Sequence, residues 1–336
     1  GGKSTLLSAW LNGEGVLVSN EVIRSRIAAL KENTIRWGYD NVIITNNDPE
    51  DFVNGELLFD LVVVDAPCSG EGLFRKDPES ICEWSVENTH HCALRQKRIL
   101  QAATQLVDEG GYLIYSTCTY NPEENELHQQ EIIDHGFEPV DISIQPEWNI
   151  TQLTTNSVQF YPHKNEGEGF YLSVFRRIKP SDFKATFRRK NKLEILNSQP
   201  YLPWVSLDAS RTLIRNEKLP ATIFPVAWQE WLEIITYKLR VVHAGIEVGE
   251  IKGKDFIPSH DLAMSFFVNK EIPSIELDEL QARLFLSKES LILSESSPKG
   301  FVLITHHQIP LGWLKNLGNR TNNLYPHEYR IRMRWK

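Results

Sequence analysis

The feature that most limits how this chain can fold is the alternation of strand and helix signals along its first 145 residues. Apolar runs that predict strands occur at 15–19, 42–45, 61–65 and 112–117, and helical periodicity occurs at 21–36 and 94–107. Repeated strand–helix–strand units join parallel strands through right-handed crossovers. We therefore predict an α/β fold with a mostly parallel, Rossmann-like sheet that has helices on both faces.

Two further signals extend this segment. Strand-like runs at 158–161 and 170–175, joined by a glycine-containing loop, predict an antiparallel hairpin that closes the sheet edge. Pro122 predicts the start of a helix, because proline is favoured in the first helical turn.

We divide the chain into four segments. Residues 1–177 would form the α/β domain, 178–195 a basic linker, 196–278 an α+β middle domain and 279–336 a small β-rich module. The last assignment depends on short β-like runs at 284–286, 291–293 and 301–305, which are separated by turn residues.

The charge of the chain is unevenly distributed. The net charge of −8 argues by itself against a nucleic-acid partner. Residues 176–192, however, contain eight basic residues and one acid, and residues 315–336 contain six basic residues and one acid. Both stretches include aromatic residues, and this mixture suits phosphate contact and base stacking. A solvated linker and a solvated C-terminus remain the alternatives for each stretch taken alone.

The chain has four cysteines, at positions 68, 82, 92 and 118. Their spacings fit no paired zinc-ligand pattern, so no metal site is predicted. A disulfide framework is not expected with so few cysteines in a chain of 336 residues. We therefore expect a reducing, cytoplasmic environment. We also expect a monomeric protein. No apolar run approaches the roughly 20 residues of a membrane span.

Residues that suit a nucleoside follow the predicted strands. Gly1-Gly2-Lys3 would form a tight turn into the first helix, and the acids Glu21, Asp48 and Asp65 each stand at or just after a strand end. Ligands of parallel α/β sheets bind beyond the carboxyl ends of the strands. A carboxylate can accept both hydroxyl protons of a ribose, and a short polar residue can accept from an adenine amino group. This order of residues predicts a Rossmann-like nucleoside site.

Two cysteines stand at the same rim. Cys68 lies in Asp65-Ala-Pro-Cys-Ser-Gly-Glu-Gly72, and Cys118 lies in Ser116-Thr-Cys-Thr-Tyr120. A helix N-terminus close behind Cys118, or a cation such as Lys3, would stabilise its thiolate. We interpret Cys82 and Cys92 as small buried hydrophobic residues.

This set of groups suits methylation of cytosine at C5. That carbon is too weakly nucleophilic to take a methyl group unaided, but addition of a thiolate to C6 activates it. The reaction also needs an acid near the ring nitrogen and a base that removes the C5 proton. The residues alone do not rank the two cysteines.

At these residues the sequence resembles the Nop/Sun family of RNA 5-methylcytosine methyltransferases. The resemblance is carried by Gly1-Gly2-Lys3-Ser4, by the two cysteine motifs with Phe74-Arg75-Lys76, and by Pro122-Glu-Glu-Asn125. Within this family, the sequence resembles the bacterial members that act on small-subunit ribosomal RNA. The stretch 312–326 resembles their PUA-like RNA-binding module.

The resemblance implies a cofactor and roles for single residues. Gly1, Gly2, Lys3, Glu21, Asp48 and Asp65 would bind S-adenosylmethionine. Cys118 would be the nucleophile, Cys68 would help to release the methylated product, and Asp65 would also face the cytosine; Lys3 completes the candidate catalytic set. Ribosomal RNA would be the partner.

The family's glycine loop follows a strand and an N-terminal RNA-binding region that are absent from this sequence. We therefore expect that this fragment lacks part of its core and binds S-adenosylmethionine poorly, and that a longer chain is the active species. Calorimetric titration would test this expectation.

Two other functions fit parts of the sequence. Gly2-Lys3-Ser4-Thr5 and the strand ending at Asp65 could belong to a P-loop NTPase, although this leaves Glu21 and both cysteines without a role. The chain could also be a catalytically inactive, rRNA-binding assembly factor.

Overall fold

The structure is a computed structural model that describes residues 1–180, 192–253 and 255–332. These residues form two compact units, one of residues 1–47 with 188–336 and one of residues 48–187. The predicted basic linker and both basic stretches lie partly outside the described residues. Our division of the chain into four domains stays a prediction.

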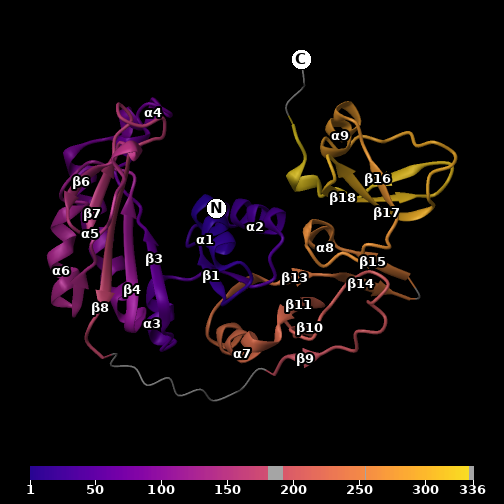
Figure 1. Cartoon of the computed structure of the whole chain (residues 1–336), viewed down its shortest axis with the longest axis horizontal. Coiled ribbons are helices and arrows are strands. Elements are labelled where there is room, and N and C mark those ends of the chain that lie inside the picture. Colours follow the sequence, from indigo (N-terminus) through magenta and orange to yellow (C-terminus); the bar gives the residue numbers. More distant parts are fainter. Residues whose placement is uncertain (181–191, 254, 333–336) are drawn as a thin grey trace. The chain divides into compact units, whose positions relative to one another are not determined.

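The unit of residues 48–187 is built on one mixed sheet, whose strands β3, β4 and β8 run side by side in Figure 1. The strand order is β3 (Phe59–Asp65), β4 (Val107–Thr117), β8 (Phe170–Arg177), β7 (Ser157–Phe160) and β6 (Thr151–Thr154), with β5 (Phe137–Pro139) also paired to β8. Strands β3 and β4 are parallel, and β8 returns antiparallel to β4. The predicted hairpin is confirmed as β7 and β8.

The described residues of this unit form four α-helices: α3 (Pro49–Asn54), α4 (Glu79–Glu83), α5 (Val86–Leu106) and α6 (Gln129–Asp134). Short 3₁₀ turns occur at η1 (Glu71–Leu73), η2 (Glu126–His128) and η3 (Pro146–Trp148). Helix α5 begins before its predicted start because the Ser85 side chain accepts from the Asn88 N–H and caps it. Leu100 and Ala103 of α5 pack on Leu113 and Tyr115 of β4 in the core of the unit.

The helix predicted at Pro122 is wrong. Residues 122–125 form turns, and the chain becomes helical only at Glu126. Asn125 has φ −119° and ψ −93°, outside the helical region, and its side chain bonds to Thr117 and Thr119. The expected helix N-terminus directly behind Cys118 is therefore missing from this position.

The other unit contains the first two strands of the expected Rossmann-like sheet. Strand β1 (Leu17–Asn20) pairs parallel with β2 (Val42–Thr45), and β12 (Val241–Ala244) adds antiparallel to β2. Helix α1 (Gly2–Leu11) precedes β1, and α2 (Arg24–Trp37) joins β1 to β2. The alternation predicted from the sequence is confirmed, but the strands form two sheets. In the α/β part, parallel pairing is confined to β1–β2 and β3–β4 among the described residues.

The remainder of this unit is α+β. Its middle part contains β9 (Glu194–Ile195), β10 (Arg211–Arg215), β11 (Thr222–Pro225), β13 (Ile246–Glu247), β14 (Gly249–Lys252), β15 (Asp255–Pro258), η4 (Val226–Trp228), α7 (Gln229–Lys238) and α8 (His260–Met264). Its last part is a four-stranded sheet in the order β16 (Ser274–Glu276), β17 (Gly300–His306), β18 (Ile309–Asn316) and β19 (Thr321–Asn323), with α9 (Glu279–Leu286) and η5 (His327–Tyr329).

The strand-like run at 284–286 was interpreted wrongly, because it belongs to helix α9. Asp278 and Gln281 form a capping box that starts this helix. The side-chain oxygen of each residue accepts a hydrogen bond from the backbone N–H of the other. This spacing was visible in the sequence and outweighs the apolar run. The run at 301–305 is confirmed as part of β17.

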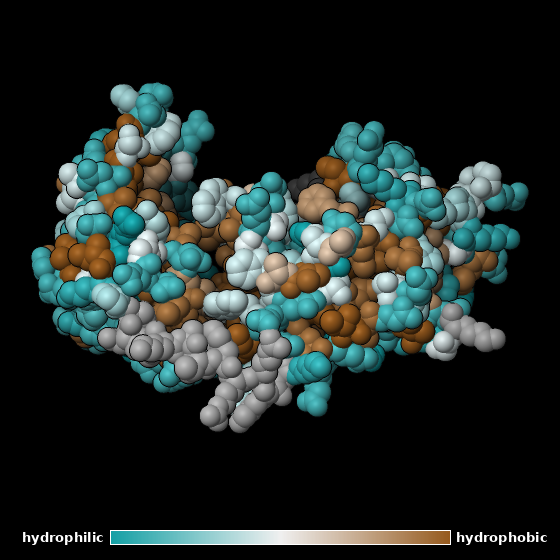
Figure 2. All heavy atoms as spheres, turned by 60° about the horizontal axis from the view of Figure 1, so that its bottom comes forward, coloured by the Kyte–Doolittle hydropathy of each residue, from teal (hydrophilic) through white to brown (hydrophobic). Residues whose placement is uncertain are grey.

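The surface carries scattered apolar side chains. Figure 2 shows hydrophobic and hydrophilic residues intermixed on one face of the molecule. Exposed apolar residues include Leu6 and Trp10 on α1 and Val86 on α5. Among the described residues, no helix is long and apolar enough to span a membrane.

We expect His260 to make the stability of the larger unit, which contains residues 1–47 and 188–336, sensitive to acid. Its ring packs against Tyr325 and Tyr329, and burial, together with Arg36 and Lys288, lowers its pKa to about 4. Unfolded histidine titrates near 6.5, so the stability is present above pH 6.5 and is lost as the pH falls towards 4. We expect the free energy of unfolding to drop by about 2 kcal/mol between pH 7 and pH 5 through this group.

Urea denaturation of the wild type and of His260→Phe at both pH values tests this expectation. Phenylalanine keeps the ring but cannot titrate, so the variant should lose about 2 kcal/mol less on acidification. The nearby pair of His243 and Asp261 has pKa values of about 3 and about 7, shifted in opposite directions mainly by burial, and its contributions cancel between about pH 4 and 6.5. Equal losses in both proteins would show that His260 is not responsible.

Candidate functional site

The candidate site lies where the parallel strands β3 and β4 end. Asp65 is the last residue of β3 and pairs in register with Ser116 of β4. The Ala66 N–H donates to the Ser116 carbonyl at 2.9 Å and holds the two strand ends together. Since Cys68 and Cys118 follow these ends, the structure brings Asp65 and both cysteines to one rim, as their positions in the sequence predict.

The two thiols are in direct contact. The Sγ atoms of Cys68 and Cys118 lie 2.7 Å apart, and the backbone N–H of Cys118 donates to Cys68 Sγ at 3.2 Å. Neither cysteine forms a disulfide, and both are only partly buried. The hydrogen bond with Cys118 and burial raise the pKa of Cys68. Two thiols this close do not both ionise, so Cys68 stays protonated.

Cys82 does not follow our interpretation as a buried hydrophobic residue. Its side chain is exposed on the short helix α4, and Cys92 on α5 is half-buried. Helix α4 has no fully buried residue, so it offers no core position for a small apolar side chain.

A buried carboxylate ties the two cysteine loops together. Glu124 accepts the Ser69 N–H at 2.9 Å, the Ser69 hydroxyl at 2.5 Å and the Gln96 amide at 2.8 Å. Gln96 also contacts the ring of His128 at 3.1 Å. Burial raises the pKa of Glu124, while the bonds from Ser69 and Gln96 lower it. The sequence pointed to the Pro-Glu-Glu-Asn stretch but assigned Glu124 no role.

Glu124 therefore positions Ser69, the neighbour of Cys68. We expect Glu124→Leu to lower the free energy of unfolding by about 3 kcal/mol, because it leaves the buried Ser69 and Gln96 donors without an acceptor. Glu124→Gln should lose less than about 1 kcal/mol, since its amide oxygen can face the two N–H donors and the Ser69 hydroxyl can turn to accept. Urea denaturation checks both values. The exposed Glu123, changed to Leu, is the matched control, and an equal loss in that variant would contradict the assignment.

A second acid organises the outer part of the site. Glu71 accepts the Thr119 hydroxyl at 2.9 Å, the Tyr120 N–H at 3.0 Å and the Trp84 indole N–H at 2.9 Å. It therefore links the loop after β3 to the loop after β4 and to α4. Glu71 was part of the quoted cysteine motif, but its partners lie too far away in the sequence to be inferred from spacing.

Gly72 allows three backbone segments to meet beside the thiols. Its N–H donates to the Cys118 carbonyl at 2.8 Å, and its own carbonyl accepts from the Gly169 N–H at 3.1 Å. A Cβ at Gly72 would lie 2.5 Å from the Cys118 oxygen and 2.7 Å from the Gly169 oxygen. Only glycine fits at this position without moving the backbone of Cys118.

The predicted cofactor residues are divided between the two units. Gly1, Gly2 and Lys3 form the start of α1, and Glu21 follows β1, so these residues belong to the larger unit. Glu21 accepts the Ile23 N–H at 2.9 Å and lies 3.5 Å from Arg26.

Asp48 has a structural role in addition to the cofactor contact that was predicted for it. Its carboxylate caps helix α3 in a capping box with Asp51. It also pairs with Arg98 at 2.9 Å, and this contact lowers the pKa of Asp48. The Asp48–x–x–Asp51 spacing was a visible sign of a helix start.

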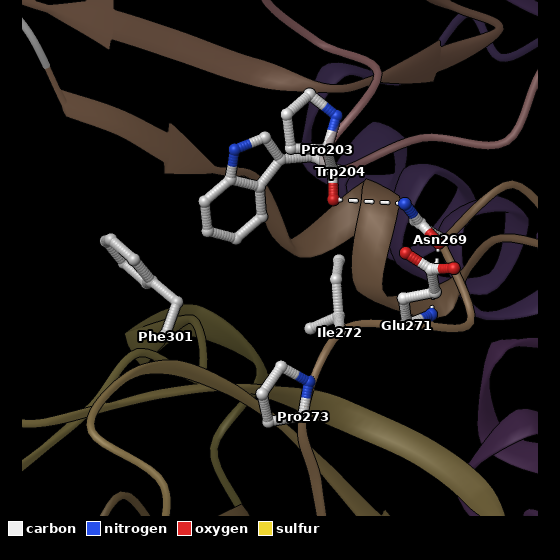
Figure 3. A pocket seen from close by; sticks show the side chains of 7 residues that line it. All are labelled: Pro203, Trp204, Asn269, Glu271, Ile272, Pro273 and Phe301. Carbon is white, nitrogen blue, oxygen red and sulfur yellow. Dashed lines mark hydrogen bonds between the residues drawn. The ribbon is translucent and has the colours of Figure 1, made fainter.

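A separate pocket in the larger unit carries none of the reactive residues. Figure 3 shows it between Trp204, Phe301, Ile272 and Pro273, and its volume is about 330 Å³. The backbone N–H of Asn269 donates a hydrogen bond to the backbone carbonyl of Trp204 at 2.9 Å. The lining is mostly apolar and contains no nucleophile.

Comparison with known families decides what kind of protein this is. Residues 1–176, more than half of the chain, match the family described as 16S rRNA methyltransferase RsmB/F. The chain belongs to this family. Residues 272–331 match the family described as Methyltransferase RsmF PUA domain. The family resemblance and the PUA-like module predicted from the sequence are thus confirmed, as is the Rossmann-like class of the α/β part.

Individual relatives agree with this assignment. Ribosomal RNA small subunit methyltransferase F of Escherichia coli is 27% identical over 344 residues, covering 98% of this chain and 71% of the relative. The protein of the same name from Shigella sonnei is 28% identical over the same shares.

Solved structures are similar over about half of the chain. "The crystal structure of NSun6 from Pyrococcus horikoshii with SFG" has a TM-score of 0.49 and 28% identity, covering 53% of this chain and 46% of that one. A methyltransferase homologue from the same organism has a TM-score of 0.45 and 26% identity, covering 53% and 58%. This chain therefore spans less than two thirds of either solved chain.

Proposed function

We propose that this chain transfers a methyl group from S-adenosylmethionine to C5 of a cytosine in small-subunit ribosomal RNA, with Cys118 as the nucleophile. Membership of the RsmB/F family supports methylation of ribosomal RNA, and the named relatives are small-subunit rRNA methyltransferases. The observation that carries the finer proposal is the contact of two thiols at 2.7 Å in the loops that follow the parallel strands, one of which ends at Asp65.

The geometry suits a covalent route. A Cys118 thiolate adds to C6 of the cytosine, and Asp65 supplies the acid that favours this addition at the ring nitrogen. The bond to C6 makes C5 nucleophilic, and bound S-adenosylmethionine supplies an electrophilic methyl group. A base then removes the C5 proton, and the bond between Cys118 and C6 breaks. Cys68 lies close enough to assist this release.

Glu21 and Asp65 have the chemistry expected for a nucleoside cofactor. Both carboxylates stand at the carboxyl ends of parallel strands, where they can accept from ribose hydroxyls or an amino group. Gly1 and Gly2 would let the backbone approach the cofactor, and Lys3 would supply a cation. Asp48 fits less well, because it would have to give up its contact with Arg98.

The remaining parts follow from the same proposal. The PUA-like module would hold the RNA. Action on ribosomal RNA would place the protein in the cytoplasm, and we expect it to work as a monomer.

Methyl transfer to RNA tests the proposal. The longer chain that the sequence analysis expects to be the active species is incubated with methyl-labelled S-adenosylmethionine and either naked small-subunit rRNA or assembled subunits, and the RNA is digested and analysed for 5-methylcytidine. Label in 5-methylcytidine is the expected result. Label on a ring or exocyclic nitrogen would overturn the C5 assignment, and no incorporation into either RNA would favour a binding protein without turnover.

A further inference from the structure

An aromatic ladder starts two residues after the proposed nucleophile. Tyr120 stacks on Tyr161, with ring centroids 5.4 Å apart and an angle of 21° between the planes. The centroid of the Tyr161 ring also lies 5.3 Å from that of the His163 ring. Lys164 Nζ lies 5.8 Å from the centroid of the Tyr161 ring. The loop between β7 and β8 supplies the last three residues, of which His163 and Lys164 are exposed.

The ladder is fixed to the nucleophile's backbone. A Cβ on Gly169 would collide with the Tyr120 ring and hydroxyl, so this ring packs directly on the Gly169 backbone. Gly169 in turn bonds to Gly72, and Gly72 bonds to the Cys118 carbonyl. The first ring therefore has a defined position relative to Cys118, and the stack extends outward from it.

Arg75 holds the loop in shape. Its guanidinium donates to the carbonyl oxygens of Pro162 at 3.2 Å, Glu166 at 2.8 Å and Gly167 at 2.7 Å. A loop tied at three carbonyls loses little further conformational freedom when a ligand binds, so its rings can contribute most of their contact energy to affinity.

On the basis of the proposed function, we propose that Tyr161, with His163 and Lys164, forms a stacking platform for a nucleotide adjacent to the target cytosine. The cytosine must leave its neighbours to reach Cys118. Stacking on an aromatic ring replaces part of the stacking energy that an adjacent base loses. A cation beside the ring suits the phosphate of the same nucleotide.

Single-stranded RNA is the partner that this chemistry favours. The exposed Glu166 offsets the charge of Lys164, and Glu168 lies 3.4 Å from Arg75, so the loop is not a strongly basic patch. Binding by flat aromatic faces is therefore the main contribution, and every base offers such a face.

The test compares Tyr161→Ala with Tyr161→Trp and with the control Tyr112→Ala. Tyr112 is exposed in the middle of β4, six residues before Cys118. We expect Tyr161→Ala to weaken binding of a short single-stranded RNA containing the methylated cytosine, and to raise its KM, by about tenfold. The affinity and KM of Tyr161→Trp should stay within about twofold of the wild type, because tryptophan keeps a flat face for stacking. Those of Tyr112→Ala should also stay within about twofold, because Tyr112 is not part of the proposed platform.

An RNA with an abasic neighbour separates stacking from folding. Removing that base should weaken binding to the wild type by the same factor and should cause no further loss in Tyr161→Ala. The platform would be overturned if Tyr161→Ala bound the RNA as well as the wild type, or if Tyr112→Ala lost as much affinity as Tyr161→Ala. It would also be overturned if Tyr161→Ala lost a further full factor of affinity on the abasic RNA. If the wild type methylates no RNA, the proposed function fails, and the same variants measured with oligocytidylate still decide the platform.

Discussion

Cys118→Ala should abolish both methyl transfer and the covalent complex with RNA, whereas Cys68→Ala should accumulate that complex. The first variant removes the atom that adds to C6, so the rate should fall by at least about 10⁴-fold. The second keeps the nucleophile but removes the thiol 2.7 Å away that assists release. The covalent complex is detected as a shifted band on denaturing gels after incubation with RNA and S-adenosylmethionine.

The exposed Cys82, changed to Ala, is the control and should behave like the wild type. The assays need a reducing agent, because two thiols in contact are readily oxidised to a disulfide. The reverse pattern, with the adduct trapped by Cys118→Ala and lost in Cys68→Ala, would exchange the two roles. Full activity in both variants would contradict covalent catalysis at this site.

Gly72→Ala should lower activity by about 100-fold although Gly72 carries no reactive group. The added Cβ would lie 2.5 Å from the Cys118 oxygen and 2.8 Å from the Gly169 Cα. The backbone must move, and a displacement of about 1 Å at a catalytic group costs roughly this factor. Overpacking should also lower the free energy of unfolding by about 2 kcal/mol. Initial rates of methyl transfer and urea denaturation measure the two effects.

Gly167→Ala provides the comparison for this variant. A Cβ at Gly167 meets no atom within 4 Å, so this substitution should change neither activity nor stability appreciably. Normal activity of Gly72→Ala would show that Cys118 does not depend on this backbone contact. A stable Gly72→Ala protein with low activity would support the positioning role most directly, because unfolding would then not explain the loss.

Several parts of the fold could be predicted because they depend on local patterns. The strands at 42–45 and 61–65 are continuous apolar runs, and the hairpin of β7 and β8 follows from two strand signals and a glycine loop. The errors arose where side chains satisfied the backbone in unexpected ways. Asn125 prevents a helix after Pro122, and the capping box of Asp278 starts α9 where a strand was predicted.

The candidate site could be predicted only in part. Asp65, Cys68 and Cys118 were found because each stands at a strand end. Glu124 was missed, because its partners Ser69 and Gln96 lie 55 and 28 residues away in the sequence. No periodicity or spacing connects such residues, since their contact depends on how the loops after β3 and β4 pack against α5.

The sequence by itself determined the α/β alternation, the family and the placement of two cysteines at strand ends, because periodic burial and strand-end position are local properties of the chain. Only the tertiary structure decided that the two thiols are in contact and that the backbone of Cys118 packs against Gly72. It also decided that Asp48 pairs with Arg98 and that the strands form two sheets. These outcomes depend on contacts between distant segments, and such contacts are fixed only when the whole chain packs.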